Sequence, residues 1–297
     1  MADDLSTPVH VVDVFSQGRY TGNQLAVVRD AHRLSADEMG CIAREMDYSE
    51  TAFVTDESPA DGGYGVRLFT PEAEVPFAGH AVLGTASVIR DAIADGDPDE
   101  ITLSLSEGSV TVTADTDGDE PIFWLEDRSA SFLETLDPEV AADVVDVAPG
   151  DVARDLPCQV VSTGLPQLMV PLESLDAVRR ATTNETPYYE HVVDGLGVKA
   201  VLVFARETYE SESDLNVRVF VEAHGIPEDS ATGSANTSLA ALLLRERTSA
   251  SELRLTAEQG YEMDRPSTLH LRADRTDDSV VARVGGRVSN VLEGRLL

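Results

Sequence analysis

The sequence predicts an α+β protein of two pseudo-symmetric domains, each a mostly antiparallel sheet that is curled, or closed as a barrel, around a central helix. Three observations predict this class. Short runs of β-branched and apolar residues between turn signals are typical of strands. Two helical segments, 79–93 and 233–247, are apolar or small nearly all round, so both should be buried on every side. Similar motifs follow one another in the same order in both halves, which indicates a duplicated domain.

The first half predicts strands, one amphipathic helix and the first buried helix. Ser35-Ala-Asp-Glu38 is a capping box that should open a helix running to about Met46. Asp61-Gly-Gly63 predicts the hairpin turn between two strands. The strands expected in this half span residues 9–15, 24–28, 51–54, 65–69, 101–105, 110–113 and 122–125.

The second half repeats this order of elements. Residues 159–170 resemble the opening strand–turn–strand, and Arg218-Val-Phe220 echoes Arg67-Leu-Phe69. Gly79 and Gly233, at the starts of the two buried helices, lie about half the chain apart. Closing strands are expected at 280–284 and 287–291.

The repeat predicts an N-terminal domain over residues 1–130 and a C-terminal domain over 131–297. The last strand could cross back to the first domain. Two acidic stretches, 115–120 and 137–155, are the candidate boundaries.

The charge of the chain excludes several classes of partner. The 297 residues include 22 Lys and Arg against 54 Asp and Glu, a formal net charge of −32. Such a surface repels phosphate backbones and anionic lipid headgroups, so neither nucleic acid nor a membrane is an expected partner. The acidic residues are dispersed along the whole chain, which predicts a halophilic protein whose self-repulsion is screened by salt. No membrane-length apolar run and no signal-peptide pattern occur, so a cytoplasmic location is expected.

No motif for a metal or a cofactor is present. Cys41 and Cys158 lie in unrelated contexts, and the six histidines never fall at i, i+4 spacing with one another. The sequence contains neither a P-loop nor a strand-linked GxGxxG pattern. We therefore expect a reaction without metal or cofactor.

The starts of the two buried helices are candidate anion sites. A helix N-terminus presents free N–H groups and a partial positive charge, and glycine lets a ligand approach the backbone. Gly79 and Gly233 could therefore help two such starts bind a substrate carboxylate. Backbone amides suit this task in a chain with so few cationic side chains. The alternative is that each glycine only eases packing around its helix.

Side chains near these motifs could move or hold a proton. Glu50 lies between the end of a helix and an apolar strand, where partial burial suits general acid/base work, although a surface glutamate is the plainer interpretation. His80 follows Gly79, where the helix dipole would keep it neutral; its alternative is a buried structural histidine. Asp229 could instead cap its turn. Ser234 could donate its hydroxyl to a ligand or simply begin the helix.

These motifs resemble one known family. The segments carrying the resemblance are Asp13-Val-Phe, Gly22-Asn-Gln-Leu-Ala-Val27, Ser49-Glu-Thr-Ala-Phe-Val54, Phe69-Thr-Pro, Glu74-Val-Pro-Phe-Ala-Gly-His80 and Glu228-Asp-Ser-Ala-Thr-Gly-Ser-Ala235. In this order, over the whole chain, they are similar to the PhzF-like family of phenazine-biosynthesis-type isomerases. The resemblance implies the diaminopimelate-epimerase fold, whose two pseudo-symmetric domains flank an active-site cleft.

The resemblance also implies roles for the candidate residues. It makes Glu50 the group that shuttles a proton, with His80 and Asp229 as catalytic partners. Ser49, Gly79, Gly233 and Ser234 would bind substrate. The cysteine pair of the related epimerases and racemases is absent from the two helix starts, so a two-thiol racemisation is not expected. Ala81 and Ser230 replace prolines that are frequent in the family, so the substrate need not be the phenazine precursor.

The function expected from the sequence is a cofactor-independent isomerase that moves a proton on a small carboxylate-bearing metabolite. Glu50 would act as the general acid/base in an interdomain cleft. The alternatives are an epimerase or racemase of a small acid, and a non-catalytic carboxylate-binding protein. The family resemblance makes a homodimer plausible.

Overall fold

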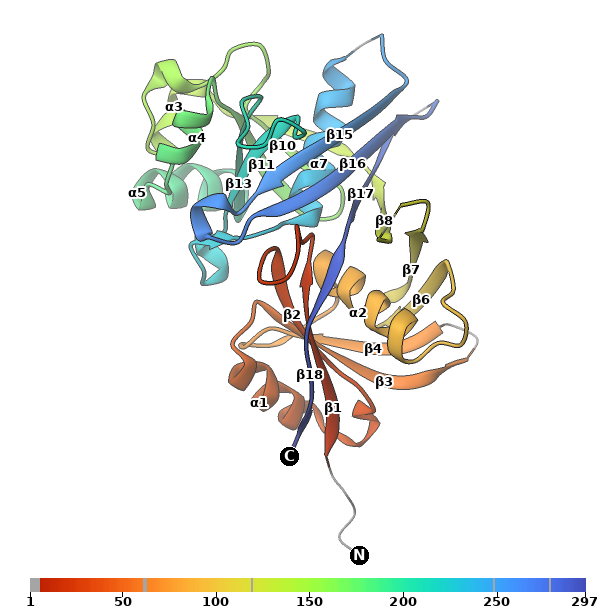
Figure 1. Ribbon diagram of the computed structural model, residues 1–297. Coiled ribbons are helices and arrows are strands. Elements are labelled where there is room, and N and C mark those ends of the chain that lie inside the picture. Colours follow the sequence, from red (N-terminus) through yellow and green to blue (C-terminus); the bar gives the residue numbers. More distant parts are fainter. Residues whose placement is uncertain (1–5, 61–62, 119, 248, 278) are drawn as a thin grey trace, which may run out of the picture. The chain divides into compact units, whose positions relative to one another are not determined.

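The computed structural model describes residues 6–60, 63–118, 120–247, 249–277 and 279–297 (Figure 1). The chain forms two compact units. Unit 1 comprises the residues up to Leu125 together with Gly286–Leu297, and unit 2 comprises Glu126–Gly285. The domain limits expected from the sequence, 1–130 and 131–297, stay a prediction. The hairpin turn predicted at 61–63 and the boundary predicted at 115–120 both include positions outside the described residues.

Unit 1 contains a sheet with the strand order β18-β1-β2-β3-β4-β6-β7-β8, and β5 adds to β4. Most neighbours are antiparallel; β2–β3 and β4–β6 are parallel. The strands are β1 (Thr7–Val14), β2 (Asn23–Val28), β3 (Glu50–Ala60), β4 (Gly63–Phe69), β5 (Glu74–Val75), β6 (Glu100–Leu105), β7 (Gly108–Asp115), β8 (Ile122–Ser129) and β18 (Val288–Leu296).

Two helices pack on opposite faces of this sheet. On one face, α2 (Gly79–Ala92) lies against strands including β1, β2, β3 and β6, and its residues from His80 to Ile89 are all buried. On the other face, α1 (Ala36–Met46) places Met39 and Ala43 against Phe53 and other sheet residues. The predicted capping box is confirmed, since Ser35 and Glu38 bond reciprocally at the start of α1.

In unit 2 the paired strands follow the order β9-β10-β11-β12-β13-β15-β16-β17, and β14 adds to β13. Its central helix is α7 (Gly233–Glu246), which packs on β10, β11, β15 and β16. The strands are β9 (Ser131–Thr135), β10 (Gln159–Ser162), β11 (Pro166–Pro171), β12 (Ala200–Ala205), β13 (Leu215–Phe220), β14 (Glu228–Asp229), β15 (Glu252–Gln259), β16 (Ser267–Arg275) and β17 (Val280–Gly286).

Shorter helices complete unit 2. The helices at 138–144, 175–180, 188–193 and 194–196 contribute residues to an apolar cluster, or pack against it, and the cluster includes Val160, Val170 and Val203 of the sheet. These helices are α3 (Pro138–Val144), α4 (Leu175–Arg180), α5 (Glu185–Pro187), the π-helix η3 (Tyr188–Val193) and α6 (Asp194–Leu196). Short 3₁₀ turns lie at η1 (Ala31–Arg33), η2 (Pro149–Asp151), η4 (Glu222–His224) and η5 (Tyr261–Met263).

Each unit thus holds one buried helix against a mostly antiparallel sheet that curls but does not close into a barrel (Figure 1). This confirms the predicted fold class. A helix that is apolar all round is stable only when its whole surface is removed from water, and a curled sheet can bury several of its faces. Within the described residues no helix has both the length and the apolar character that crossing a membrane requires.

The duplication extends to individual strand pairs. In unit 1, β3 and β4 pair Thr51 with Phe69, and in unit 2, β12 and β13 pair Val201 with Phe220. In both units the arginine two residues before this phenylalanine forms a two-bond ion pair with a glutamate that opens the next short strand. The pairs are Arg67–Glu74, with bonds of 2.8 and 2.7 Å, and Arg218–Glu228, with bonds of 2.9 and 2.8 Å. The register therefore assigns each position of one unit an equivalent in the other.

One buried histidine makes the stability of unit 1 depend on pH. His10 lies in β1, and its buried Nε2 has no hydrogen-bond partner among the described residues. Burial, and secondly the charge of Arg29, lower the pKa of His10 below 6.5, against the opposing effects of Glu293, Glu57 and Asp91.

Protonation of His10 is less favourable in the folded state than in the unfolded state. The free energy of unfolding is therefore undiminished above pH 6.5 and falls as the pH drops below that value. We expect His10→Leu to reduce the loss of unfolding free energy between pH 7.5 and pH 5.5. Urea unfolding of both proteins across this range measures the difference. Equal losses would show that His10 does not carry the effect.

The acidic surface predicts a second stability effect. We expect the thermal midpoint to rise with potassium chloride into the molar range, because salt shortens the Debye length from ~10 Å at 0.1 M to ~3 Å at 1 M. Screening then relieves repulsion in a chain of net charge −32. Calorimetry at increasing salt measures the midpoint, and a flat or falling curve would contradict a halophilic protein.

Candidate active site

Glu50 and His80 meet at the start of the buried helix of unit 1. Glu50 begins β3, opposite Leu25 of β2, and His80 is the second residue of α2. His80 Nε2 lies 3.2 Å from Glu50 Oε2, and the two side chains are 8% and 19% exposed. Both atoms are buried and neither has a well-aligned hydrogen bond within the described part of the chain. Glu50 is therefore not a fully exposed surface glutamate, whereas His80 is buried as its structural alternative also expects, so the role of the pair stays a prediction.

A carboxyl group and an imidazole at this distance can hold one proton between them. The proton can sit on Glu50 and point at Nε2, or sit on Nε2 and point at the carboxylate. Partial exposure of Glu50 leaves room for another group to approach it. The pair therefore has the chemistry of a general acid/base with a hydrogen-bonding neighbour.

Ser49 precedes Glu50, and its side chain contacts the first residue of β2. Its hydroxyl donates to Asn23 Oδ1 at 3.4 Å, and Asn23 is buried at the start of β2. Ser49 thus bonds within the protein while remaining partly exposed. Asn23 is a residue that the sequence did not single out, although a polar residue opening an apolar strand is a usable signal.

The N-terminus of α2 has the features of an anion site. Its N-cap, Ala78, cannot cap through a side chain, and no acidic residue lies in the first turn. By contrast, α1 has a complete capping box and two acidic residues in its first turn. The first N–H groups of α2 therefore keep their capacity to bind an anion.

Neither backbone nor packing explains why residue 79 is glycine. A Cβ added to Gly79 would meet only Leu125 Cδ2, at an ordinary contact distance of 3.8 Å. At Gly84, one turn further on, a Cβ would lie 2.6 Å from Leu25 and 2.8 Å from Val14. Close packing therefore requires a glycine at Gly84 but not at Gly79, and the role of Gly79 in binding a ligand stays a prediction.

In unit 2, Asp229 lies beside the start of α7. It ends the short strand β14, and its Oδ2 accepts a 2.6 Å hydrogen bond from the Thr232 hydroxyl. Thr232 is the N-cap of α7 but does not cap it through its side chain, and the first turn holds no acidic residue. Asp229 therefore accepts a hydrogen bond within its own turn, as the capping interpretation of the sequence expects, and its catalytic role stays a prediction.

Ser234 lies in the first turn of α7 and bonds to a neighbouring strand. Its Oγ accepts from Gln167 Nε2 at 3.1 Å, so the hydroxyl can still donate. Gln167 is only 3% exposed. Gly233 is buried just before Ser234, at the position equivalent to Gly79.

Four polar residues around Asp229 and Ser234 were missed by the sequence analysis: Gln167, Thr232, Asn236 and Gln259. Gln167 and Asn236 belong to a buried strand and a buried helix, where a polar side chain needs a partner, and that is a usable signal. Thr232 and Gln259 have polar neighbours in the sequence, so no such contrast marks them. The partners lie far along the chain, so only the fold reveals them.

The two units share one arrangement of strands but carry different residues at two equivalent positions. The register places Ala200 at the position of Glu50, and Val75 at the position of Asp229. Each unit therefore carries one acidic group beside its buried helix, at different positions of the shared framework. That both helix starts serve one cleft stays a prediction.

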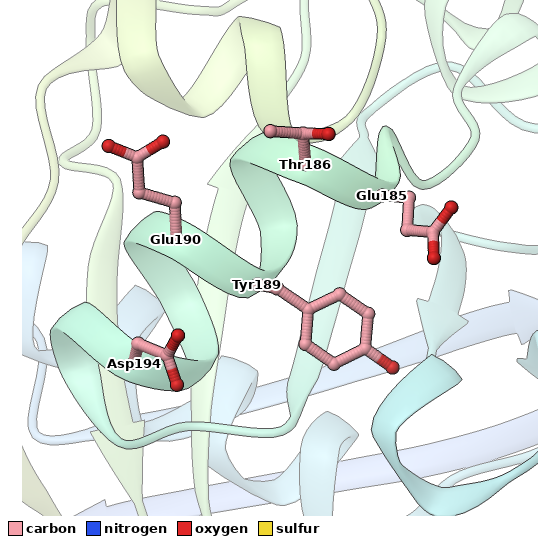
Figure 2. A pocket seen from close by; sticks show the side chains of 5 residues that line it. All are labelled: Glu185, Thr186, Tyr189, Glu190 and Asp194. Atoms are coloured by element: carbon pink, nitrogen blue, oxygen red, sulfur yellow. The ribbon is translucent and has the colours of Figure 1, made fainter.

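A hollow of about 530 Å³ elsewhere in unit 2 does not suit a carboxylate. Figure 2 shows the side chains that line it on α5, η3 and α6, three of which are acidic: Glu185, Thr186, Tyr189, Glu190 and Asp194. The three carboxylates would repel an anionic substrate. Among the described residues, no group of three or more histidine, cysteine or acidic side chains is arranged to hold a metal ion.

Comparison with known proteins gives consistent results over the whole chain. A family model described as phenazine biosynthesis-like protein matches residues 12–294. The trans-2,3-dihydro-3-hydroxyanthranilate isomerase of Pseudomonas aeruginosa is 33% identical, over 96% of this chain and 97% of that protein. A predicted epimerase from Pseudomonas aeruginosa is 31% identical with a TM-score of 0.79, over 98% of this chain and 99% of that one.

A PhzF-family protein from Bacillus anthracis superposes with a TM-score of 0.90 at 23% identity, over 98% of this chain and 99% of that chain, which shows the shared fold.

Proposed function

Because the chain belongs to the phenazine biosynthesis-like protein family and is an isomerase, we propose that it moves a proton between two carbons of a small carboxylate-bearing metabolite. Glu50 is the general acid/base, and the reaction needs no cofactor. One observation carries this proposal: the partly exposed Glu50 and the buried His80, 3.2 Å apart, lie at the start of a buried helix that has no side-chain cap.

The reaction follows from the chemistry of that pair. The Glu50 carboxylate takes a proton from an activated C–H, and the electron pair of that bond moves into a migrating double bond. The Glu50 carboxylic acid then returns a proton to the second carbon, so no oxidant or reductant is needed. His80 accepts from or donates to Glu50 and holds a polar group of the substrate.

Backbone amides orient the substrate. The proposal gives the first N–H groups of α2, beside Gly79, the role of binding the carboxylate of the substrate. Asp229, Gly233, Ser234 and Ser49 bind its other polar groups. Fixing the substrate in this way holds the reacting carbon at hydrogen-bond range of one base. A substrate with a carboxylate, an amine and a hydroxyl, as in trans-2,3-dihydro-3-hydroxyanthranilate, offers groups for each of these contacts.

An epimerase is the second candidate, favoured by one observation. Each unit carries its own acidic group, Glu50 or Asp229, beside a buried helix, and epimerisation commonly uses one acid/base on each face of a carbon. A non-catalytic carboxylate-binding protein would keep the helix starts alone. A cytoplasmic location and a homodimer remain predictions.

Reaction in deuterium oxide separates these functions. The purified protein is incubated with trans-2,3-dihydro-3-hydroxyanthranilate and a panel of small amino and hydroxy acids, and products are followed by NMR. We expect a product whose double bond has moved and whose newly protonated carbon carries deuterium. Deuterium at the original carbon with inversion would indicate an epimerase, and binding with neither product nor incorporation would indicate a binding protein.

A further inference from the structure

Asp229 is held by a network of three polar side chains, of which Thr232 and Gln259 bond to it directly and Asn236 bonds to Gln259. The Thr232 hydroxyl donates to Asp229 Oδ2 at 2.6 Å. Gln259 Nε2 donates to the Asp229 carbonyl at 2.7 Å and to Thr232 Oγ1 at 3.2 Å. Gln259 Oε1 accepts from the Thr232 amide at 3.2 Å and from Asn236 Nδ2 at 2.8 Å. The three residues thus form one connected network that ends on the carboxylate.

The network is anchored to the rigid framework of unit 2. Gln259 and Asn236 are fully buried. Gly260, which follows Gln259 with a φ of +80°, approaches the Ser230 carbonyl so closely that a Cβ would lie 2.6 Å from it. Ser267 Oγ donates to the same carbonyl at 3.1 Å. Strands β15 and β16 therefore hold the turn that carries Asp229.

The duplicated framework of unit 1 does without this network. By register, Asp229 is equivalent to Val75, and Gln259, the last residue of β15, is equivalent to Leu105, the last residue of β6. Counting from the equivalent glycines at the helix starts, Thr232 corresponds to Ala78 and Asn236 to Val82. All four positions are apolar in unit 1. The fold itself therefore does not need the polar set, which occurs only where the carboxylate does.

We infer that Thr232, Asn236 and Gln259 are positioning residues that orient the Asp229 carboxylate toward the substrate. This inference rests on the proposed role of Asp229 in substrate binding. Thr232 fixes one carboxylate oxygen as an acceptor, Gln259 fixes Thr232 and the backbone of Asp229, and Asn236 fixes Gln259. Rotation of the carboxylate is thereby restricted before substrate arrives, which lowers the cost of binding it in one orientation.

Kinetics of matched threonine variants test the inference. We expect Thr232→Val to lower kcat/KM at least tenfold, whereas Thr232→Ser, which keeps the hydroxyl, stays within about threefold of wild type. In an Asp229→Asn background, Thr232→Val should cost nothing further, because the network acts through the carboxylate. A loss of the same size in both backgrounds would indicate a merely structural role and would overturn the inference.

A substrate-free readout keeps this test independent of the reaction. In protein labelled with ¹³C-aspartate, the carboxyl signal that disappears in Asp229→Asn identifies Asp229, and its titration is followed by NMR. A hydroxyl donating to a carboxylate favours the charged form, so Thr232→Val and Gln259→Leu should move the midpoint to higher pH and Thr232→Ser should not. Unchanged midpoints in the first two variants would overturn the inference.

Failure of the proposed function gives a different result. If Asp229→Asn keeps full turnover, Asp229 does not act on the substrate, whatever the titration shows. If Asp229→Asn abolishes turnover while Thr232→Val and Gln259→Leu match wild type in kinetics and titration, the proposed function stands and the positioning role fails. Thermal unfolding checks that each variant is folded, and Leu is the residue that unit 1 carries at the position of Gln259.

Discussion

Replacing Glu50 with glutamine should lower kcat by at least ~10²–10⁴, the usual contribution of one general acid/base. Glutamine keeps the shape and hydrogen-bonding capacity of Glu50 beside His80, but it cannot take a proton. Substrate binding should therefore change by less than about tenfold. Steady-state kinetics with trans-2,3-dihydro-3-hydroxyanthranilate, or with the substrate found in the panel, measure kcat, and calorimetry with the aromatic analogue 3-hydroxyanthranilate measures binding.

A matched control separates this effect from the general loss of a negative charge. Glu100 also begins a strand of unit 1 but is exposed, so Glu100→Gln should leave kcat unchanged. If Glu50→Gln retains near-full turnover while His80→Ala or Asp229→Asn abolishes it, the acid/base has been assigned to the wrong residue.

A methyl group at the start of α2 should weaken substrate binding without harming the fold. We expect Gly79→Ala to raise KM at least about tenfold, because the new Cβ occupies the space through which the carboxylate reaches the first amides. Inside the protein the same Cβ meets only Leu125, at 3.8 Å. The thermal midpoint should stay level or rise slightly, since alanine is the better helix former.

Gly84→Ala in the same helix is the opposite case and the natural control. Its Cβ would lie 2.6 Å from Leu25 Cδ2 and 2.8 Å from Val14 Cγ2, both in fully buried residues. Such overpacking typically costs about 1–3 kcal/mol of unfolding free energy. If Gly79→Ala instead lowers the thermal midpoint and leaves KM unchanged, Gly79 serves packing and the anion site is wrongly placed.

Local sequence rules predicted much of the fold. The capping box at Ser35 and Glu38 predicted the start of α1. The apolar character of α2 and α7 predicted that both helices are buried. These features depend on neighbouring residues and on periodicity, which a sequence displays directly. The repeated Arg67 and Arg218 motifs likewise indicated the duplication before the matching ion pairs with Glu74 and Glu228 were visible.

For the candidate site, such rules predicted individual residues but not the contacts between them. Glu50 and His80 lie near motifs that mark a strand start and a helix start, so each could be chosen separately, but their 3.2 Å approach is a tertiary contact between β3 and α2. The network around Asp229 was not predicted because its members are far apart in the sequence. Asp229 precedes α7, whereas Gln259 lies in β15, which follows α7. Nothing local to Gln259 distinguishes it from an ordinary strand residue.

The most direct test of the account is solvent-deuterium incorporation by the wild-type protein and Glu50→Gln, compared side by side under identical conditions. The central claim is that Glu50 itself moves the proton between two carbons of the substrate. Because the Glu50 side chain is 19% exposed, its carboxyl proton exchanges with solvent before it is returned. Product formed by the wild type in deuterium oxide should therefore carry deuterium at the newly protonated carbon, and the rate of incorporation should fall ~10²–10⁴-fold in Glu50→Gln. Incorporation at the wild-type rate by Glu50→Gln would contradict the central claim.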